Sequence, residues 1–452
     1  MRRFLFLTML AGCPDRTISA IDPTQSKVEV KDIPAVPNKK ADILFVVDNS
    51  GSMAEEQASL RANFGTMMSV LQTLEGGQPD LHVAVVTSDL GTSTTDGTNE
   101  GSKFGCVGGG EAGAFRMTPT VSGRFISDDG AGNKNYTGTL EDAFSALADV
   151  GVKGCGIEQH LGSIEAGLTN VANTGFMRDD AYLAVVVIGD EDDCSLAHSG
   201  LFGSSSDPDT VNYACTADGV ECDDTPNDMQ TPGVRTKCHP RTTSPKWTQS
   251  PQHYADFLKG LKDDPRDVVA AGIVGDITPF AIEKNASNVS ILKESCTYSG
   301  PTGDQTAFPA VRTASFLEQF TLNSRSTICG ADLKPAMTQI GALVKKLLVD
   351  PCFDQQLADA DPSTPELDPD CQISDVQRVT GGADVELAAI PSCKSAPSAL
   401  PCWHIDEAPV ECSYTDTTPH YKLVIERGGV VPAPNVHVRA QCVTAEPGGS
   451  QF

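Results

Sequence analysis

The chain has 452 residues, more than one compact domain usually contains, which predicts two or three domains. It carries 33 basic and 60 acidic residues, and a formal net charge of −27 disfavours binding to nucleic acid or anionic lipid through a basic surface. With 39% hydrophobic and 21% charged residues, and no apolar run of the roughly 18 residues that span a bilayer, the sequence is that of a folded, non-spanning protein.

The first residues have the pattern of an export signal. Residues 1–3 include two arginines, residues 4–10 are apolar apart from one threonine, and the sequence Leu-Ala-Gly-Cys ends at Cys13. This tetrapeptide resembles the lipobox of bacterial lipoproteins, in which the chain is cleaved before the cysteine and lipid is attached to it. The resemblance implies a signal peptide over 1–12 and a lipidated tether over 13–38. The alternative is a short amphipathic start in which the tetrapeptide occurs by chance.

The cysteine content favours an oxidising compartment. Fifteen cysteines are too many for a reduced cytosolic chain, and no C-x-x-C pair is present. With Cys13 lipidated, 15 − 1 = 14 cysteines remain, an even number that allows seven disulfides. The candidates for disulfide bonds are Cys106, Cys155, Cys194, Cys215, Cys222, Cys238, Cys296, Cys329, Cys352, Cys371, Cys393, Cys402, Cys412 and Cys442.

Apolar strands alternate with amphipathic helices over residues 39–349. In chain order the predicted elements are strand Ile43–Val47, helix Glu55–Leu74, strand Leu81–Thr87, helices Leu140–Asp149 and Glu158–Asn173, strand Tyr182–Ile188, helix His253–Lys262, strand Asp267–Val274 and helix Leu333–Val349. Strands that are apolar on both faces and separated by helices are typical of a mostly parallel sheet covered on both sides. The predicted fold class is therefore α/β, with a doubly wound sheet.

Two long segments interrupt this alternation, and the chain changes character near its end. Residues 92–135 are rich in Gly, Ser and Thr, and residues 195–250 carry three cysteines, so we expect cross-linked insertions, at least for the second. Residues 350–452 contain six cysteines, lack helical periodicity and include the predicted strands Tyr421–Glu426 and Val436–Val443. This region is predicted to be a small Cys-rich β domain, and the sequence leaves its disulfide pairing open.

Polar side chains follow the first predicted strand. Asp48, Ser50 and Ser52 alternate, so a tight loop can turn one carboxylate and two hydroxyls to the same point, and Gly51 permits the turn. The carboxyl ends of parallel strands border the crevice in which such sheets bind ligands. Hard oxygen ligands without thiolate or imidazole select Mg²⁺, Mn²⁺ or Ca²⁺ over zinc or copper. The loop is therefore a candidate divalent-cation site.

A second strand ends in acidic residues. Asp190 follows the strand Tyr182–Ile188, and Glu191, Asp192 and Asp193 come directly after it. Because parallel strands end at one edge of a sheet, we expect Asp190 to supply the second carboxylate of the site. The run 191–193 is interpreted as a solvated loop, with a second cation site as the alternative.

Together these features resemble the von Willebrand factor type A (VWA) domain, and Asp48-x-Ser50-x-Ser52 resembles its metal-ion-dependent adhesion site (MIDAS). The resemblance covers residues 39–349, and the two insertions are departures in length. The pattern D-x-S-x-S alone is weak, but the apolar strand before it and the later strand that ends in Asp190 make it specific.

The resemblance also implies a function. The chain is similar to bacterial lipoproteins that carry this domain, through residues 154–159 and 190–195. It implies a bound divalent cation, with Mg²⁺ expected and Ca²⁺ or Mn²⁺ as alternatives. It further implies a protein or other macromolecular partner that offers a carboxylate to the metal.

One position departs from the family. A threonine from a middle loop completes the metal shell in VWA domains, and Cys155 stands where it is expected. A disulfide-bonded cysteine is a poor ligand for Mg²⁺, and we hypothesise that Glu158 supplies the missing oxygen. The alternative is that Glu158 only interacts favourably with the helix dipole. With Asp48, Asp190 and Glu158 as ligands the ion would be nearly neutralised and a weaker Lewis acid toward a partner carboxylate, so a structural site is the alternative to an adhesive one.

We expect a binding protein and not an enzyme. The motifs G-x-S-x-G, H-E-x-x-H, G-x-x-x-x-G-K-[ST] and G-x-G-x-x-G are absent, so no catalytic residue is assigned. The predicted function is that of a lipid-anchored protein of the bacterial cell envelope, at the outer membrane or cell surface rather than the inner membrane. It would contact the membrane only through its lipid and bind a partner through the cation. The alternatives are a structural scaffold with a closed or empty metal site and, less favoured, a metal-dependent hydrolase using Asp48 and Asp190.

Overall fold

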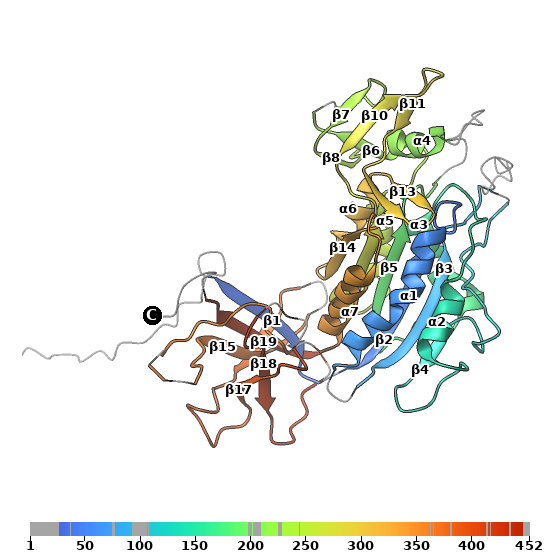
Figure 1. The fold of residues 1–452 in the computed structure, drawn as a ribbon. Coiled ribbons are helices and arrows are strands. Elements are labelled where there is room, and N and C mark those ends of the chain that lie inside the picture. The colour runs from blue at the N-terminus through green and yellow to red at the C-terminus, as the bar shows by residue number, and fades with distance from the viewer. Residues whose placement is uncertain are drawn as a thin grey trace, which may run out of the picture.

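A computed structural model describes residues 27–445 except for short gaps at 37, 75–76, 93–105, 107, 198–200, 202–208, 225–227, 244, 350, 362, 365, 380–381, 413–414, 416 and 434. The expected signal peptide and lipidated Cys13 lie outside these residues. A central sheet with its helices forms the body of the molecule, a small unit with α4 stands at one end, and the C-terminal strands lie at the other (Figure 1). The parts of the chain that are described therefore form a mixed α/β structure with several sheets.

The central sheet has six strands in the order β14-β9-β5-β2-β3-β4. All neighbours pair in parallel except β3 and β4, which are antiparallel. The four strands predicted from the sequence occupy its centre, and every residue of β5 and β9 is buried, as expected for strands covered on both faces. The strands are β2 (Lys40–Val47), β3 (Asp80–Thr87), β4 (Ile126–Asp128), β5 (Tyr182–Gly189), β9 (Val268–Val274) and β14 (Asn323–Thr327).

Helices cover both faces of this sheet. Side chains alternate along β2, so that Phe45 packs into one apolar cluster and Leu44 into the other. The first cluster includes α1 (Ala54–Leu71), α2 (Leu140–Ala148) and α7 (Lys334–Val349), and the second includes α3 (His160–Thr169), α5 (Pro251–Lys259) and α6 (Val311–Leu317). The helix predicted over 158–173 is thus shorter than expected, because α3 begins at His160 and a 3₁₀ turn (Val171–Asn173) follows it.

The second predicted insertion is partly a folded unit and not a simple loop. Its elements pack with a later part of the chain around an apolar cluster that contains Tyr213, Val220 and Phe280. The unit consists of α4 (Asp209–Gly219), β6 (Val220–Cys222), β7 (Gly233–Arg235), β8 (Cys238–Pro240), β10 (Phe280–Lys284) and β11 (Ser290–Leu292). The antiparallel hairpin of β12 (Cys296–Gly300) and β13 (Gly303–Ala307) follows it.

The C-terminal part is built from β strands, as predicted, but it includes one strand from the start of the chain. Val28–Pro34 forms β1, which pairs with β19 (Val436–Val443) in a sheet of order β1-β19-β15-β16. The prediction of a tether over 13–38 is therefore wrong for this stretch, because every second residue from Glu29 to Ile33 is buried against the C-terminal strands. The other strands are β15 (Cys371–Gln377), β16 (Val385–Ala389), β17 (Cys402–Glu407) and β18 (Tyr421–Glu426).

All fourteen cysteines predicted to be cross-linked form disulfides. Three of these disulfides lie wholly in the C-terminal part, so that part is cross-linked only to itself. Seven disulfides are typical of a protein that resides in an oxidising compartment, such as the cell envelope or the exterior. The pairs are Cys106–Cys155, Cys194–Cys215, Cys222–Cys238, Cys296–Cys329, Cys352–Cys412, Cys371–Cys442 and Cys393–Cys402.

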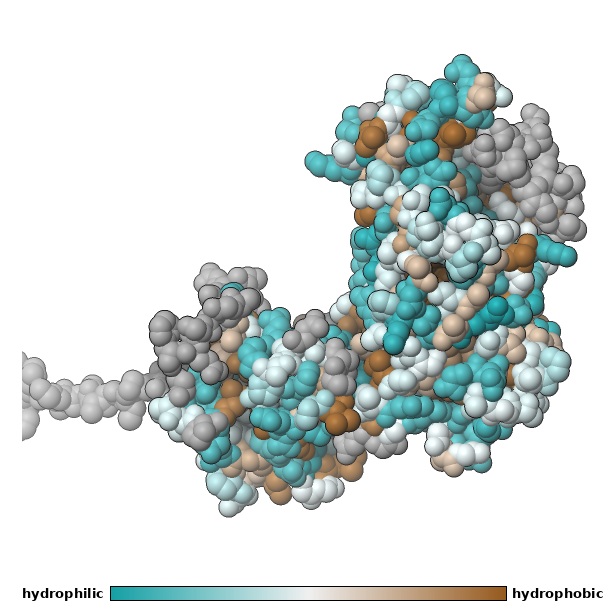
Figure 2. All heavy atoms as spheres, in the orientation of Figure 1, coloured by the Kyte–Doolittle hydropathy of each residue, from teal (hydrophilic) through white to brown (hydrophobic). Residues whose placement is uncertain are grey.

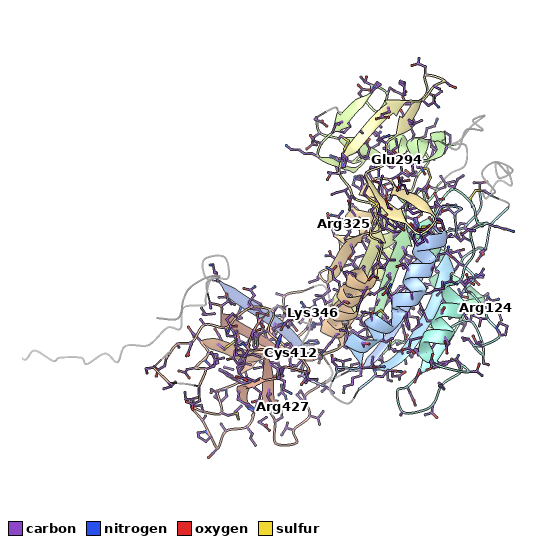
Figure 3. The ribbon with its side chains drawn as sticks, in the orientation of Figure 1. Arg124, Glu294, Arg325, Lys346, Cys412 and Arg427 are labelled. Atoms are coloured by element: carbon purple, nitrogen blue, oxygen red, sulfur yellow. A yellow bond between two sulfur atoms is a disulfide. The ribbon has the colours of Figure 1, made fainter. Side chains whose placement is uncertain are left out.

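Ion pairs join the C-terminal part to the base of the central sheet. Arg266 Nη1 lies 2.8 Å from Asp384 Oδ2. Lys346, which is labelled in Figure 3, lies on α7 with its Nζ 2.7 Å from Asp354 Oδ2. Hydrophilic residues cover much of the visible surface of both parts (Figure 2). Among the residues that the structure describes, no helix has both the length and the apolar character to cross a bilayer.

Candidate metal centre

The first predicted metal ligand lies at the carboxyl end of β2. The side chain of Asp48 is fully buried, and its Oδ1 accepts hydrogen bonds from the Ser50 amide (2.7 Å) and the Ser88 hydroxyl (3.2 Å). Its other oxygen, Oδ2, is buried and has no hydrogen-bond partner within the described part of the chain. The hydroxyls of Ser50 and Ser52 lie 3.1 Å apart on the same loop. The loop therefore turns its oxygens together, as the alternating pattern predicts.

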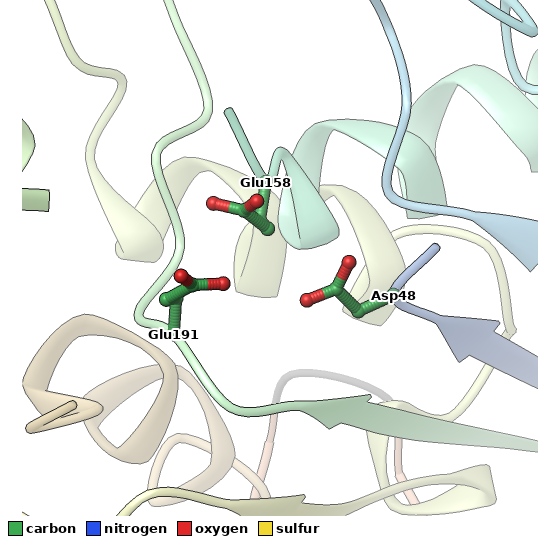
Figure 4. Close-up of side chains that lie close together, drawn as sticks. All are labelled: Asp48, Glu158 and Glu191. Atoms are coloured by element: carbon green, nitrogen blue, oxygen red, sulfur yellow. The ribbon is translucent and has the colours of Figure 1, made fainter. Parts of the chain in front are cut away.

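Three carboxylates meet at this edge of the sheet. One oxygen each of Asp48, Glu158 and Glu191 lies within 4.8 Å of the other two (Figure 4), and we call this set the carboxylate cluster. Glu158 is 2% exposed and precedes α3, so it does not lie in the first turn of that helix as the sequence predicted. The structure thus brings Glu158 beside Asp48, as the substitute-ligand hypothesis requires.

Asp190 lies next to the cluster but is not a member of it. It follows the last residue of β5 and is 4% exposed, and its Oδ1 has no hydrogen-bond partner among the described residues. Its backbone oxygen accepts from the Phe308 amide at 2.7 Å. Burial raises the pKa of the Asp190 carboxyl, and a hydrogen bond from Ser52 opposes this rise.

Burial and mutual repulsion disfavour the charged form of every acid in the cluster. The pKa of Asp48 is raised by burial and then by the charge of Asp190. The pKa of Glu158 is raised well above its ordinary value by burial and by the charge of Asp48, and that of Glu191 by burial and the charge of Glu158. A bound cation would offset both effects, because it favours ionised carboxylates and accepts their unpaired lone pairs.

Tight backbone packing positions Glu158. The Gly154 amide donates to the Asn49 backbone oxygen at 2.8 Å, and a Cβ at Gly154 would overlap the side-chain amide of Asn49. Only glycine fits such a close approach of two loops. Cys155 is fully buried and bonded to Cys106, so its sulfur is not a ligand. The loop before α3 is thereby fixed against the metal loop, and Glu158 follows at its end.

Glu191 belongs to the carboxylate cluster, although its sequence position indicated only a solvated loop or a second cation site. The interpretation of 191–193 as a solvated loop is wrong: Asp193 is fully buried and pairs with Arg312, whose Nη2 lies 2.9 Å from its Oδ2. Asp192 accepts from the backbone amides of Arg312 and Thr313 and so caps α6. The position of Glu191 directly after a strand end was the available signal, but the contacts that bury its loop come from α6, 120 residues further on.

The donor set fits a hard divalent cation. Carboxylate and hydroxyl oxygens are the ligands that Ca²⁺ and Mg²⁺ prefer, and no sulfur or imidazole belongs to the carboxylate cluster. The buried unpartnered oxygens of Asp48, Asn49 and Asp190 point to the same conclusion, because buried polar atoms are normally satisfied. In such a site the cation would be held by the cluster, with the serine hydroxyls and Asp190 nearby.

No protein-family model matches the chain, and no curated protein matches it. Among solved structures, it is similar to proximal thread matrix protein 1 from the mussel byssus, with 11% identity, a TM-score of 0.28, and coverage of 72% of this chain and 51% of that one. It is also similar to human COPII-coat protein Sec24c (10% identity, TM-score 0.35, 95% and 48% covered) and to the pilus adhesin RrgA from Streptococcus pneumoniae (12% identity, TM-score 0.24, 92% and 58% covered). The chain spans about half the length of the first of these structures. At these TM-scores the similarities decide neither family nor function.

Proposed function

We propose that the chain is a VWA-type protein of the bacterial cell envelope that binds a macromolecular partner in a cation-dependent manner. The observation that carries the proposal is the carboxylate cluster at the end of β2, beside the loop Asp48-x-Ser50-x-Ser52. The strand order, with a single antiparallel edge strand and helices on both faces, supports a doubly wound VWA architecture. The seven disulfides support an exported protein, and the sequence before residue 27 supports lipid anchoring at Cys13.

Calorimetry on the purified protein tests the metal site. We expect saturable binding of Ca²⁺ or Mg²⁺ to the wild type and none to Asp48→Ala, because that change removes a buried carboxylate of the cluster. Glu366→Gln is the matched control, since it removes an exposed carboxylate from the C-terminal part and leaves the cluster intact. No binding to the wild type would contradict the proposal.

Chemical cross-linking tests the partner. Three samples of envelope extract would be cross-linked: one to the wild type with cation, one to the wild type with chelator, and one to Asp48→Ala with cation. A defined product that needs both the cation and Asp48 supports partner binding at this edge. Products that are identical in all three samples would contradict it.

Burial of the site favours a second candidate, a scaffold whose ion is structural. Asp48 is fully buried and Glu158 is 2% exposed, so the ion would be surrounded mainly by groups of this chain. In that case chelation would lower the thermal midpoint of unfolding without releasing any partner. The two candidates share the metal site and differ in whether a partner oxygen reaches it.

A further inference from the structure

The carboxylate cluster gathers three separate segments of the chain, and one of them leads into the small unit that contains α4. Asp48 comes from the end of β2, Glu158 from the loop before α3, and Glu191 from the loop after β5. Which ion the cluster binds, and what that ion holds in place, depends on cation binding as proposed above.

Protein atoms surround most of the site. Asp48 and Glu158 have almost no exposed surface, and the unpartnered oxygens of Asp48, Asn49 and Glu191 each expose less than 1 Å². Where a VWA domain would offer a threonine, the Cys106–Cys155 disulfide packs instead, together with Ile157 and the Cys194–Cys215 disulfide. Glu191 is half-buried and Ser52 is exposed, so the site is closed on the side of Asp48 and Glu158.

The composition of the cluster favours Ca²⁺. Its three carboxylates can each bind through one oxygen or two, and Ca²⁺ takes about 6–8 oxygen ligands in a flexible geometry. Mg²⁺ also keeps several waters when it binds to proteins, whereas Ca²⁺ accepts a full set of protein oxygens, including bidentate carboxylates. An enclosed site with three carboxylates therefore suits Ca²⁺ better.

Glu191 connects the ion site to the small unit. Its Oε1 accepts from Asn212 Nδ2 on α4 at 3.2 Å. Three residues later, Cys194 is bonded to Cys215 on the same helix, and the Cys194 amide donates to the Glu158 backbone oxygen at 2.7 Å. An ion that draws Glu191 toward Asp48 and Glu158 thus also fixes the segment from which α4 is held.

We propose that the carboxylate cluster is a closed calcium site that fastens the α4 unit to the edge of the central sheet and leaves no coordination position for a partner. Partner recognition then belongs to the surface that the fastened unit presents, and extracellular calcium regulates that surface. In this assignment Ca²⁺ takes the place of the expected Mg²⁺, and no partner carboxylate binds the ion. The ion instead holds the α4 unit at the carboxyl edge of the central sheet.

Terbium luminescence tests the closure directly, because Tb³⁺ substitutes for Ca²⁺ and its lifetimes in H₂O and D₂O count the waters on the ion. We expect about one water or none, and Ca²⁺ binding at least about tenfold tighter than Mg²⁺ binding by competition. About three or more waters, or tighter Mg²⁺ binding, would overturn the closed calcium site while leaving cation-dependent partner binding intact. No saturable binding of Tb³⁺, Ca²⁺ or Mg²⁺ would overturn the proposed function as well.

Hydrogen exchange tests the fastening. In the wild type we expect Ca²⁺ to slow amide exchange in α4 and β6–β8 at least about tenfold, because local opening would have to release the ion. Glu191→Gln should lose this protection and Glu366→Gln should keep it, with the near-ultraviolet dichroism of both variants compared to the wild type as a check on folding. Unchanged exchange in the wild type with and without Ca²⁺ would refute the coupling without reference to any variant.

Discussion

Replacement of Arg312 by methionine should destabilise the protein strongly. The guanidinium is 1% exposed, and it pairs with the fully buried Asp193 at 2.9 Å. It also donates to the backbone oxygens of Asp193 (2.8 Å) and Gln249 (2.7 Å). Removal of one partner of a buried ion pair leaves an uncompensated charge, and the free energy of unfolding typically falls by about 3–5 kcal/mol. We expect Arg312→Met to lie in this range.

A double-mutant cycle isolates the pair from the packing of the methylene groups. Arg312→Met, Asp193→Asn and the double variant would be unfolded in urea with disulfides intact. The double variant should be more stable than the sum of the two single changes predicts, by about 2 kcal/mol, because neither side chain of the pair then carries a buried charge. Glu318→Gln, an exposed acid at the end of the same helix, is the control and should change the free energy of unfolding by less than about 0.5 kcal/mol.

Two results would contradict a buried ion pair of this strength: a fall of less than about 1 kcal/mol in the free energy of unfolding of Arg312→Met, or additivity of the two single changes. Either result would mean that Asp193 finds another partner or water when the guanidinium is removed. Cation affinity is a second readout, since Glu191 lies two residues before Asp193 and depends on the same loop. Arg312→Met should weaken Ca²⁺ binding in calorimetry.

Three further outcomes are expected from other parts of the structure. In protein freed of cations by a chelator, the free energy of unfolding should fall as the pH rises above about 4, the ordinary pKa of a carboxyl group. The reason is that the folded cluster, with its raised pKa values, holds protons that the unfolded chain has already lost. Urea titrations at several pH values measure this profile, and added Ca²⁺ should flatten it. Replacement of Cys106 and Cys155 by serine removes a cross-link over 49 residues and should lower stability by about 4 kcal/mol, with weaker Ca²⁺ binding by calorimetry. Phe144→Ala removes a ring whose centroid lies 3.7 Å from that of Phe64 in a stacked arrangement. In denaturant titrations it should lower the free energy of unfolding by about 3–5 kcal/mol, and the cation affinity should be unchanged.

The central strands could be predicted because their local pattern is unambiguous. The run Tyr182–Gly189 is apolar throughout and is buried throughout, so its sequence alone indicates a strand covered on both faces. β1 could not be predicted in the same way. Its partner β19 begins about 400 residues later, and its buried positions include Glu29 and Lys31, which local hydropathy assigns to solvent. The alternation of apolar and charged residues in β1 therefore points to the wrong buried face, since Val30 is exposed while Glu29 and Lys31 are buried.

The candidate site likewise contains residues that a local pattern brings together and residues that only long-range packing brings together. Asp48, Ser50 and Ser52 are adjacent in sequence, so their convergence follows from one turn. Glu158 could be proposed from its spacing to Cys155, but its meeting with Glu191 depends on how two loops pack, which no local pattern encodes. Disulfide partners are similarly non-local: the sequence supplied the fourteen candidates, and only the fold decides that Cys155 bonds to Cys106.

The pairing of β1 with β19 has a mechanical consequence. A lipid on Cys13 would hold the chain shortly before Val28, and a partner bound at the carboxyl edge would pull at the far end of the central sheet. Force would then run along the backbone of β1 and directly into β2, because the chain passes from Pro34 to Lys40 between the two strands. β19 pairs with β1 from the side, so the C-terminal part lies outside the covalent path between the anchor and the central sheet. The Cys371–Cys442 disulfide ties β19 to β15 within that part. The pairing would thus hold the C-terminal part beside the line of pull without loading it.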